Sequence, residues 1–576
     1  MGNCLYSPWQ RQYNLIKKIE YPDSLGLLYS AFTHYTGFRV NNGEYKLMGL
    51  APYGEDKYVD VIKEHLIDIR EDGSIKLNMK YFGYLNQMCM INKHFNDLFG
   101  GPPRKAESKV TRREMDLAKS IQVVTEEVVL KMANHAFEVT GCDYLCLAGG
   151  VALNCVANGR LLREGKFKDI WIQPAAGDAG GSLGAALFVY NSHYYKKRVL
   201  NKNEPPIQRG SYWGPDFNDD EIISVLNSYN YKYKKVEGSV RSKLIASYLA
   251  EGKVIGHFSG RMEFGPRALG ARSILADPRD EITQSKLNLK IKYRESFRPF
   301  APTVLVEDIN EYFDINRPSP YMLLVAQVRK ERCLPTTDES DIIKKVNQKR
   351  SDVPAITHVD YSARIQSINR KDHPMYYDII REFKNLTGYG VIVNTSFNVR
   401  GEPIVCTPYD ALNCFMNTEM DVLAIGNYIL SKEDQKEAIY TKRGKALEKF
   451  GPTNVNKLDE KKKLEKKAER LFSKYITSIS KKIEKNPIDL NFKQRSGGSF
   501  WKPCNEKELC WKYNNDLNIH ADKEVEYILS FWNKYSDRDK ELFKPLIGEL
   551  INLKNKFKYE DVMAGEGMSG SIYVMF

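Results

Sequence analysis

A short apolar run that ends in a glycine turn occurs twice in the first third of the chain, and this pattern constrains the fold most. The run Tyr144–Ala148 leads into the glycine pair at 149–150. The run Asp169–Gln173 leads to a second glycine-rich stretch at 177–181, after which a helix is expected near Ser182. Buried strands that alternate with glycine turns and helices are typical of an α/β fold.

The length of the chain predicts more than one domain. Its 576 residues exceed what a single hydrophobic core usually holds. The stretch 193–206 is polar and ends in two prolines, as linkers do. We therefore place one domain at 1–195 and a second α/β domain at 207–435. The region 440–576 is lysine-rich and then aromatic, and we expect a linker and a helical accessory module there.

The composition indicates a soluble protein. Hydrophobic residues make up 42% and charged residues 28% of the chain. No apolar run approaches the roughly 20 residues that a membrane-spanning helix needs. The first residues do not resemble a secretory signal, and the ten cysteines lack zinc-site spacing. We therefore expect a cytoplasmic protein without a membrane partner.

The net charge of +13 is compatible with nucleic acid, a membrane surface or anionic small substrates as partners. Much of the excess lies within 442–485, where a solvated, partly helical linker is the simpler explanation. We therefore do not expect nucleic acid as a partner.

Two glycine turns of the first domain are candidate ligand contacts. Gly149 and Gly150 let the backbone approach a phosphate or sugar, and Asn154 follows as a candidate nucleotide contact. A plain strand-to-helix turn explains these residues equally well. Asp178, near Gly180 in the second turn, precedes a helix and is a candidate metal ligand. A helix-capping aspartate is the alternative for this residue.

A basic cluster marks the second domain. Arg267 lies in one segment rich in glycine and proline, and Lys292 and Arg298 lie in the next. Guanidinium groups bind phosphate and carboxylate in bidentate fashion, so several of them predict a polyanionic ligand. Structural salt bridges are the alternative, with Glu263 and Glu295 as candidate partners.

Two further stretches of the second domain are polar in a regular pattern. One alternates on a predicted strand, so that its polar side chains share a face: His358, Asp360, Ser362, Arg364 and Gln366. The other is an apolar strand that opens into amides and a hydroxyl: Asn394, Ser396 and Asn398. The first face is either a wet surface or a site, and the second is either a phosphate cradle or a capped helix start.

Several longer strings carry a resemblance to a known family. They are EYKLMGLAPYG from Glu44, GGVALN, GDAGGSLGAA, GPRALGARS, FRPFAP and VNTSFN. In this order they resemble the ATP-dependent O-carbamoyltransferases of nodulation and antibiotic pathways, over roughly residues 20 to 435.

The resemblance implies two catalytic units. The first resembles part of a TsaD-like domain with the actin-like ATPase fold, and the second a YrdC-like α/β domain. In the family, the second domain makes carbamoyl adenylate from carbamoyl phosphate and ATP, with Mg²⁺ on the nucleotide. The first then transfers the carbamoyl group to a hydroxyl of a small molecule, beside iron or another divalent metal.

The motif match also implies roles for individual residues. The catalytic candidates are Lys292, Arg298 and Ser396. The substrate-binding candidates are Arg267, Arg364, Asn394, Asn398, Asn154, Gly149, Gly150 and Gly180. Asp178 matches the metal ligand of the family.

One departure from the family affects the first domain. Family members carry an early segment with a His-x-x-x-His metal pair, and none of the nine histidines here forms such a pair. The resemblance therefore implies that the N-terminal part of the TsaD-like domain is missing. Adenylate formation should survive this loss, whereas transfer should require a separate N-terminal fragment.

Two other functions remain open from the sequence. Related domains occur in threonylcarbamoyl-adenylate and tRNA-modifying enzymes, for which the basic tail would be suitable. A truncated nucleotide-binding remnant without full turnover is the non-enzymatic alternative.

Overall fold

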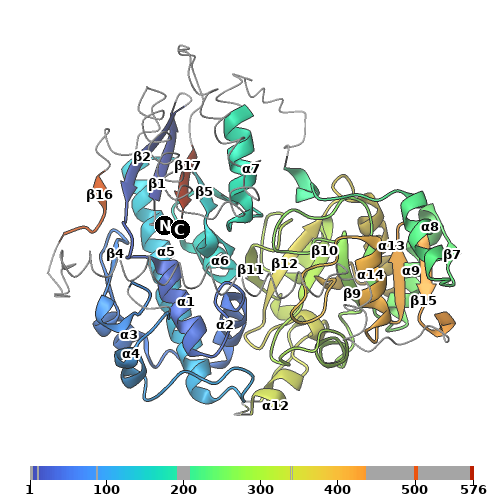
Figure 1. Ribbon diagram of the computed structural model, residues 1–576, viewed down its shortest axis with the longest axis horizontal. Coiled ribbons are helices and arrows are strands. Elements are labelled where there is room, and N and C mark those ends of the chain that lie inside the picture. Colours follow the sequence, from blue (N-terminus) through green and yellow to red (C-terminus); the bar gives the residue numbers. More distant parts are fainter. Residues whose placement is uncertain are drawn as a thin grey trace, which may run out of the picture.

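The computed structural model describes residues 4–9, 12–85, 89–190, 208–337, 339, 341–435, 498–503 and 571–575. These residues form two α/β units that lie side by side (Figure 1). The first unit contains residues 4–190 and the two short C-terminal segments, and the second contains residues 208–435. The expected linker at 193–206 and the lysine-rich stretch at 442–485 lie outside the described residues.

The first unit is built on a six-stranded mixed sheet. Its strands, in spatial order, are β16 (Lys502–Pro503), β2 (Gln12–Lys18), β1 (Cys4–Trp9), β17 (Ser571–Met575), β5 (Tyr144–Ala148) and β6 (Asp169–Ile172). Strands β17, β5 and β6 are parallel, and the remaining neighbours are antiparallel. The expected strands at 144–148 and 169–173 are confirmed.

The C-terminal segments belong to this sheet. Strand β17 lies between β1 and β5, with Ser571 opposite Tyr144 and Val574 opposite Leu5. Strand β16 pairs with the outer strand β2. The two described pieces of the region 440–576 therefore contain strands, where helices were expected, and the rest of that region lies outside the described residues.

A 29-residue helix, α5 (Arg112–Thr140), is the longest element of the first unit. Thr111 and Glu114 form a capping box at its start, and Gly141 ends it with a left-handed backbone (φ 63°). The other elements of the unit are α1 (Leu25–Tyr35), α2 (Glu44–Leu50), α3 (Val59–His65), α4 (Lys93–Leu98), α6 (Cys155–Glu164), α7 (Ala179–Phe188) and the hairpin β3 (Ile67–Ile69) with β4 (Ile75–Leu77). No helix in the described part of the chain is both long and apolar enough to cross a bilayer.

The second unit contains a nine-stranded mixed sheet. Its strands, in spatial order, are β11 (Leu324–Gln327), β12 (Ser362–Ile368), β10 (Ala301–Leu305), β13 (Val391–Ser396), β9 (Arg272–Ala276), β8 (Ile255–Phe258), β14 (Val422–Ile425), β15 (Tyr428–Ser431) and β7 (Lys234–Lys235). Strands β8, β9, β10 and β14 are buried along their whole length, as expected for a sheet covered on both faces.

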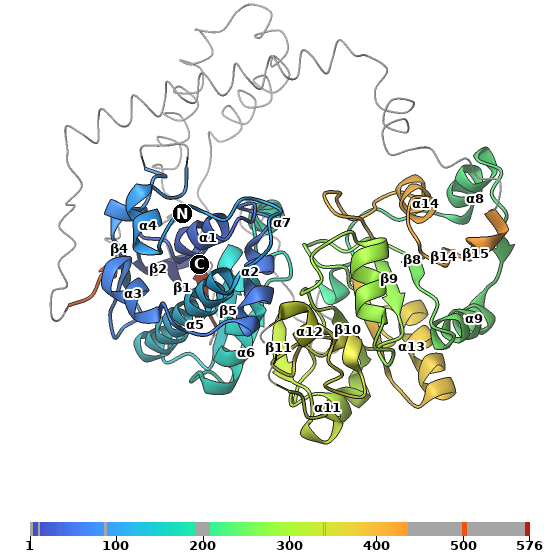
Figure 2. The same ribbon diagram turned by 90° about the horizontal axis from the view of Figure 1, so that it is seen from below.

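Two helices cover one face of this sheet. Helices α9 (Gly238–Ala250) and α13 (Pro374–Thr387) pack against each other, and Leu249 and Phe383 join one apolar cluster with Ile392 of β13. The remaining helices are α8 (Asp219–Ser228), α10 (Thr283–Lys286), α11 (Ile309–Tyr312), α12 (Ile342–Asn347) and α14 (Pro408–Met416). The view from below shows the two units side by side as well (Figure 2).

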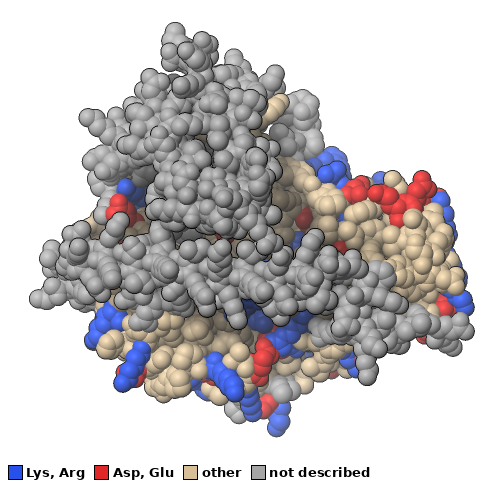
Figure 3. Space-filling view, viewed as in Figure 1, with Lys and Arg blue, Asp and Glu red and all other residues tan. Residues whose placement is uncertain are grey.

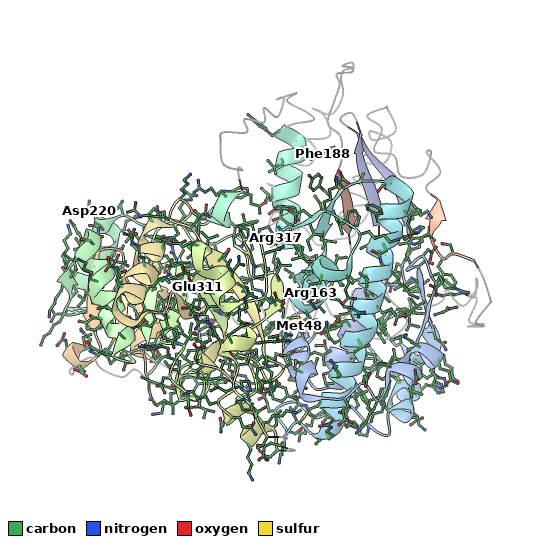
Figure 4. All side chains as sticks on the ribbon, turned by 180° about the vertical axis from the view of Figure 1, so that it is seen from behind. Met48, Arg163, Phe188, Asp220, Glu311 and Arg317 are labelled. Atoms are coloured by element: carbon green, nitrogen blue, oxygen red, sulfur yellow. The ribbon has the colours of Figure 1, made fainter. Side chains whose placement is uncertain are left out.

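Helix α6 of the first unit covers the edge strand β11 of the second. Asn158 donates to the carbonyl of Leu323 at 3.1 Å, and Arg163 donates to that of Val325 at 3.4 Å. Met48, Arg163 and Arg317 lie along the boundary between the units (Figure 4). An exposed strand edge with free carbonyls is thereby covered, which joins the two units through direct hydrogen bonds.

Candidate active site

Four arginines of the second unit gather where it meets the first unit. Arg267 lies in the loop between β8 and β9, Arg294 and Arg298 precede β10, and Arg364 lies on β12. We call these four residues the arginine cluster. Burial lowers the pKa of all four. For Arg364, whose pKa falls to about 9, the neighbouring charge of Arg267 adds to the effect of burial.

The arginine cluster is short of negative charge. The Nε atoms of Arg267 and Arg364 are buried and have no hydrogen-bond partner among the described residues. Within that part of the chain, no carboxylate forms a salt bridge with Arg267, Arg294 or Arg364, and Glu295 approaches Arg298 only at 3.8 Å. On the described surface visible in Figure 3, by contrast, Lys and Arg lie beside Asp and Glu. Buried donors without partners are costly, so the cluster is suited to a polyanion.

Lys292 organises the adjacent loop after β13. Its ammonium donates to the carbonyls of Ser396 (2.5 Å) and Asn398 (2.9 Å), to Ser396 Oγ (3.2 Å) and to Asn398 Oδ1 (2.6 Å). Burial, together with the charge of Arg294, lowers the pKa of Lys292 well below its usual value. Four acceptors use all three protons of the ammonium. The structure thus brings these three predicted site residues together, with Lys292 holding the loop that presents Ser396.

Asn394 supports the loop that carries Arg267. Its amide donates to the carbonyl of Ala268 at 3.3 Å and to Gln366 Oε1 at 2.7 Å. Gln366 in turn donates to the carbonyl of Leu269 at 2.7 Å. Because Asn394 is almost fully buried, its position is beneath the Arg267 loop in this structure, and its contact with a substrate remains a prediction.

Glu263 also holds the loop that carries Arg267. Its Oε1 accepts hydrogen bonds from the backbone N–H groups of Leu269 (2.7 Å), Ala271 (2.7 Å) and Arg272 (3.3 Å). Burial raises the pKa of Glu263, although these hydrogen bonds act in the opposite direction. Glu263 therefore binds backbone amides instead of forming the salt bridge that was considered for it. A pattern of charges in the sequence does not reveal this role.

The structure corrects the predicted polar strand. Strand β12 begins at Ser362, so His358 and Asp360 lie in the turn before it. Asp360 accepts a hydrogen bond from Ser362 Oγ at 2.7 Å and pairs with His358 at 3.4 Å. The shared face is therefore limited to Ser362, Arg364 and Gln366, because the turn at Tyr361 (φ 63°) interrupts the alternation.

The first glycine turn of the first unit contains the Asn154 candidate. Asn154 caps α6 by accepting from Ala157 N at 3.1 Å, and it exchanges two hydrogen bonds with Gln122. Gly149 adopts a left-handed backbone (φ 94°), and a Cβ on Gly150 would meet no described atom within 4 Å. The amide of Asn154 is thus engaged within the protein, and its nucleotide contact remains a prediction.

The second glycine turn contains Asp178 and Gly180. Asp178 is exposed and makes no capping hydrogen bond to α7. A Cβ on Gly180 would lie 2.2 Å from the carbonyl oxygen of Ala175, so this turn requires glycine. Among the described residues, no group of three or more His, Cys, Asp or Glu side chains could hold a metal ion. These residues therefore do not build the iron site that the resemblance implies, and we derive no step through a metal there.

Two residues of the first unit face the arginine cluster and were not predicted. The Tyr45 ring lies 4.7 Å from Arg298 Cζ, and Cys155, at the start of α6, interacts electrostatically with Arg267 and Arg364. Tyr45 lies within the EYKLMGLAPYG string and Cys155 directly follows GGVALN. Both residues lie in or beside these strings, but only the three-dimensional arrangement shows that they lie near the arginines of the second unit.

Comparisons with known proteins define the class. Residues 2–187 match the family model described as carbamoyltransferase N-terminus, and residues 246–432 match that described as carbamoyltransferase C-terminus. The chain is 58% identical over 443 residues to the protein sll1178 of Synechocystis sp., covering 76% of this chain and 70% of that protein. It is 37% identical over 423 residues to nodulation protein NolO of Bradyrhizobium diazoefficiens, covering 72% and 70%.

A third relative is matched over a smaller part of its length. The chain is 37% identical over 415 residues to nodulation protein NolNO of Sinorhizobium fredii, covering 71% of this chain but 56% of that protein. Two matched family models and these relatives show that the chain belongs to the carbamoyltransferase family, a class of enzymes.

Proposed function

We propose that the second unit forms carbamoyl adenylate from carbamoyl phosphate and ATP, for transfer to a hydroxyl of a small molecule. The observation that supports this proposal most is the arginine cluster, in which buried Nε atoms of Arg267 and Arg364 lack partners. Both substrates are polyanions, and guanidinium groups neutralise phosphate charge while fixing its orientation.

The atom balance defines the products to be measured. Carbamoyl adenylate retains both carbamate oxygens, so carbamoyl phosphate must first lose its phosphate to water. A carbamate oxygen then displaces pyrophosphate from the α-phosphorus of ATP. One turnover therefore consumes one water and releases one phosphate and one pyrophosphate, and Mg²⁺ accompanies the nucleotide.

The residues near the arginine cluster have different roles in this reaction. Arg267, Arg298 and Arg364 bind the phosphate groups, because their guanidinium groups gather at one place. Ser396 donates a hydrogen bond to a phosphate oxygen from the loop that Lys292 holds. Lys292 acts through this loop, since its protons are already shared among four acceptors.

The first unit would receive the adenylate. The open space beside Gly150 and the glycine turn near Asp178 lie in the unit that the family resemblance assigns to transfer. No group of three or more His, Cys, Asp or Glu side chains in the described part of the chain could hold a metal ion, so no metal-dependent step of the transfer is assigned to it.

The test incubates the purified chain with ATP, carbamoyl phosphate and Mg²⁺, and follows phosphate, pyrophosphate and carbamoyl adenylate, the last by mass spectrometry. Arg298→Ala and Arg364→Ala should lose the carbamoyl phosphate-dependent products. Arg370→Ala is the matched control, because the Arg370 side chain is 63% exposed and pairs with Asp378 on the surface. Wild-type protein that is folded yet yields no adenylate would contradict the proposal.

A further inference from the structure

The segment that carries Arg298 is held by the first unit. Tyr53 donates a hydrogen bond to the carbonyl of Phe297 at 2.9 Å, and its ring contacts that of Phe297 edge-on, with centroids 6.1 Å apart. Phe38 contacts the same ring from 6.4 Å. These three aromatic residues fix the backbone next to Arg298, so part of the arginine cluster depends on contacts from outside its own unit.

Tyr45 of the first unit lies against the arginine cluster. It interacts electrostatically with each of the four arginines. The Arg298 guanidinium carbon lies 4.7 Å from the centre of the Tyr45 ring, within the range of a cation–π contact. The ring restricts the plane of the guanidinium, and the Tyr45 hydroxyl raises the pKa of Arg298 through a hydrogen bond, against the lowering by burial.

Lys46 binds the carboxylate that would otherwise engage Arg298. Its ammonium lies 2.9 Å from Glu295 Oε1, whereas Arg400 lies 3.4 Å from the same oxygen and Arg298 3.8 Å from Oε2. Burial alone would raise the pKa of Glu295, yet the hydrogen bond from Lys46 and nearby charges hold it below its usual value. Lys46 engages Oε1 of Glu295, whereas Oε2, the oxygen nearer Arg298, has no hydrogen-bond partner among the described residues. Glu295 is thus a carboxylate that can compete with phosphate for Arg298, and Lys46 holds it by its other oxygen.

We propose that Tyr45 and Lys46 are positioning residues through which the first unit completes the anion site of the second. Tyr45 orients the Arg298 guanidinium, and Lys46 holds Glu295 through Oε1 at a distance that leaves Arg298 free to bind phosphate. This inference rests on the proposed function for its substrates. Its consequence is that the arginine cluster binds its anions well only while the two units are docked.

The test measures kcat and KM for ATP and carbamoyl phosphate in pyrophosphate release by the full chain. Lys46→Met should raise KM about tenfold with little change in kcat, because Arg298 is captured by Glu295 in the free enzyme. The double variant Lys46→Met with Glu295→Gln should recover most of the lost affinity, since the competitor has lost its charge. A purely structural role for Lys46 gives no such recovery. Lys57→Met, which removes a half-exposed lysine of the same unit, is the control.

The pH dependence provides a second readout. In Lys46→Met, protonation of Glu295 at lower pH should release Arg298, so that KM falls toward the wild-type value as the pH is lowered. Tyr45→Phe removes the hydroxyl that acts on Arg298 and should raise KM, and Tyr45→Leu, which also removes the ring, should raise it further.

The outcomes separate this inference from the proposed function. If the wild type releases pyrophosphate but Lys46→Met has an unchanged KM, or the double variant is no better than the single one, the inference is wrong and the proposed function stands. If the wild type shows no turnover, calorimetry measures how tightly the wild type, Lys46→Met and the double variant bind inorganic pyrophosphate. Weaker binding by Lys46→Met that the double variant restores supports the inference, and equal affinities overturn it.

Discussion

Gly159 of α6 lies directly against Val325 of β11, so closely that a Cβ on Gly159 would sit 2.3 Å from the Val325 carbonyl oxygen. This contact joins the first unit to the edge strand of the second. Asn158 and Arg163, on the same helix, donate to carbonyls of that strand segment. The two units can therefore approach this closely only because residue 159 has no side chain.

Gly159→Ala should force the units apart or distort β11. We expect a loss of stability on the order of 1–3 kcal/mol, as for overpacking of a close contact. Thermal unfolding checks this expectation. Gly184→Ala in helix α7 is the matched control, because its Cβ would meet no described atom within 4 Å and alanine favours a helix. Equal losses of stability in Gly159→Ala and Gly184→Ala would contradict the close contact between Gly159 and Val325.

Glu263→Ala should destabilise the second unit by about 3 kcal/mol, because three backbone N–H groups would lose a buried acceptor. Glu263→Gln retains an oxygen at the same place and should lose much less. Urea unfolding of both variants measures the difference. A loss of equal size in the two variants would mean that the charge, rather than the acceptor geometry, is what the loop requires.

Arg364→Met should stabilise the ligand-free protein and abolish anion binding. The buried guanidinium has an unpartnered Nε and a pKa lowered to about 9 by burial and by Arg267. Removing an uncompensated buried charge should therefore contribute on the order of 1 kcal/mol of stability. Thermal unfolding with and without Mg²⁺–ATP checks both effects. Arg370→Met is the control, and a destabilised Arg364→Met protein would show that the charge is satisfied internally.

His373 should make stability depend on pH. Burial, with Arg241 nearby, lowers its pKa from 6.5 to about 3. The unfolded chain then binds a proton below pH 6.5 that the folded chain does not, so stability falls as the pH drops through the range between these two values. Between pH 7 and pH 5 the expected loss is about 2 kcal/mol.

Urea unfolding at several pH values measures this loss. His373 caps α13 by accepting from Tyr376 N at 3.3 Å, and asparagine can also cap a helix. His373→Asn should therefore remain folded and lose less stability on acidification. Parallel pH profiles for wild type and variant would assign the acid sensitivity to other groups.

Local elements could be predicted from the sequence because their signals are local. The strands at 144–148 and 391–396 follow from short apolar runs that end in glycine or polar residues. The contact of Lys292 with Ser396 and Asn398 joins residues more than 100 positions apart, and only the family resemblance placed them in one site. The prediction failed at His358, because a turn at Tyr361 imitates strand alternation in the sequence.

The sequence by itself determined the α/β class, the family and three arginines of the candidate site, Arg267, Arg298 and Arg364, since propensity and motif order are properties of neighbouring residues. Only the tertiary structure decided which groups face those arginines. Lys46 and Glu295 are 249 residues apart in the chain but 2.9 Å apart in space, and β17 pairs with β5 from the far end of the chain. Such contacts arise from the packing of whole units, and no pattern of adjacent residues encodes them.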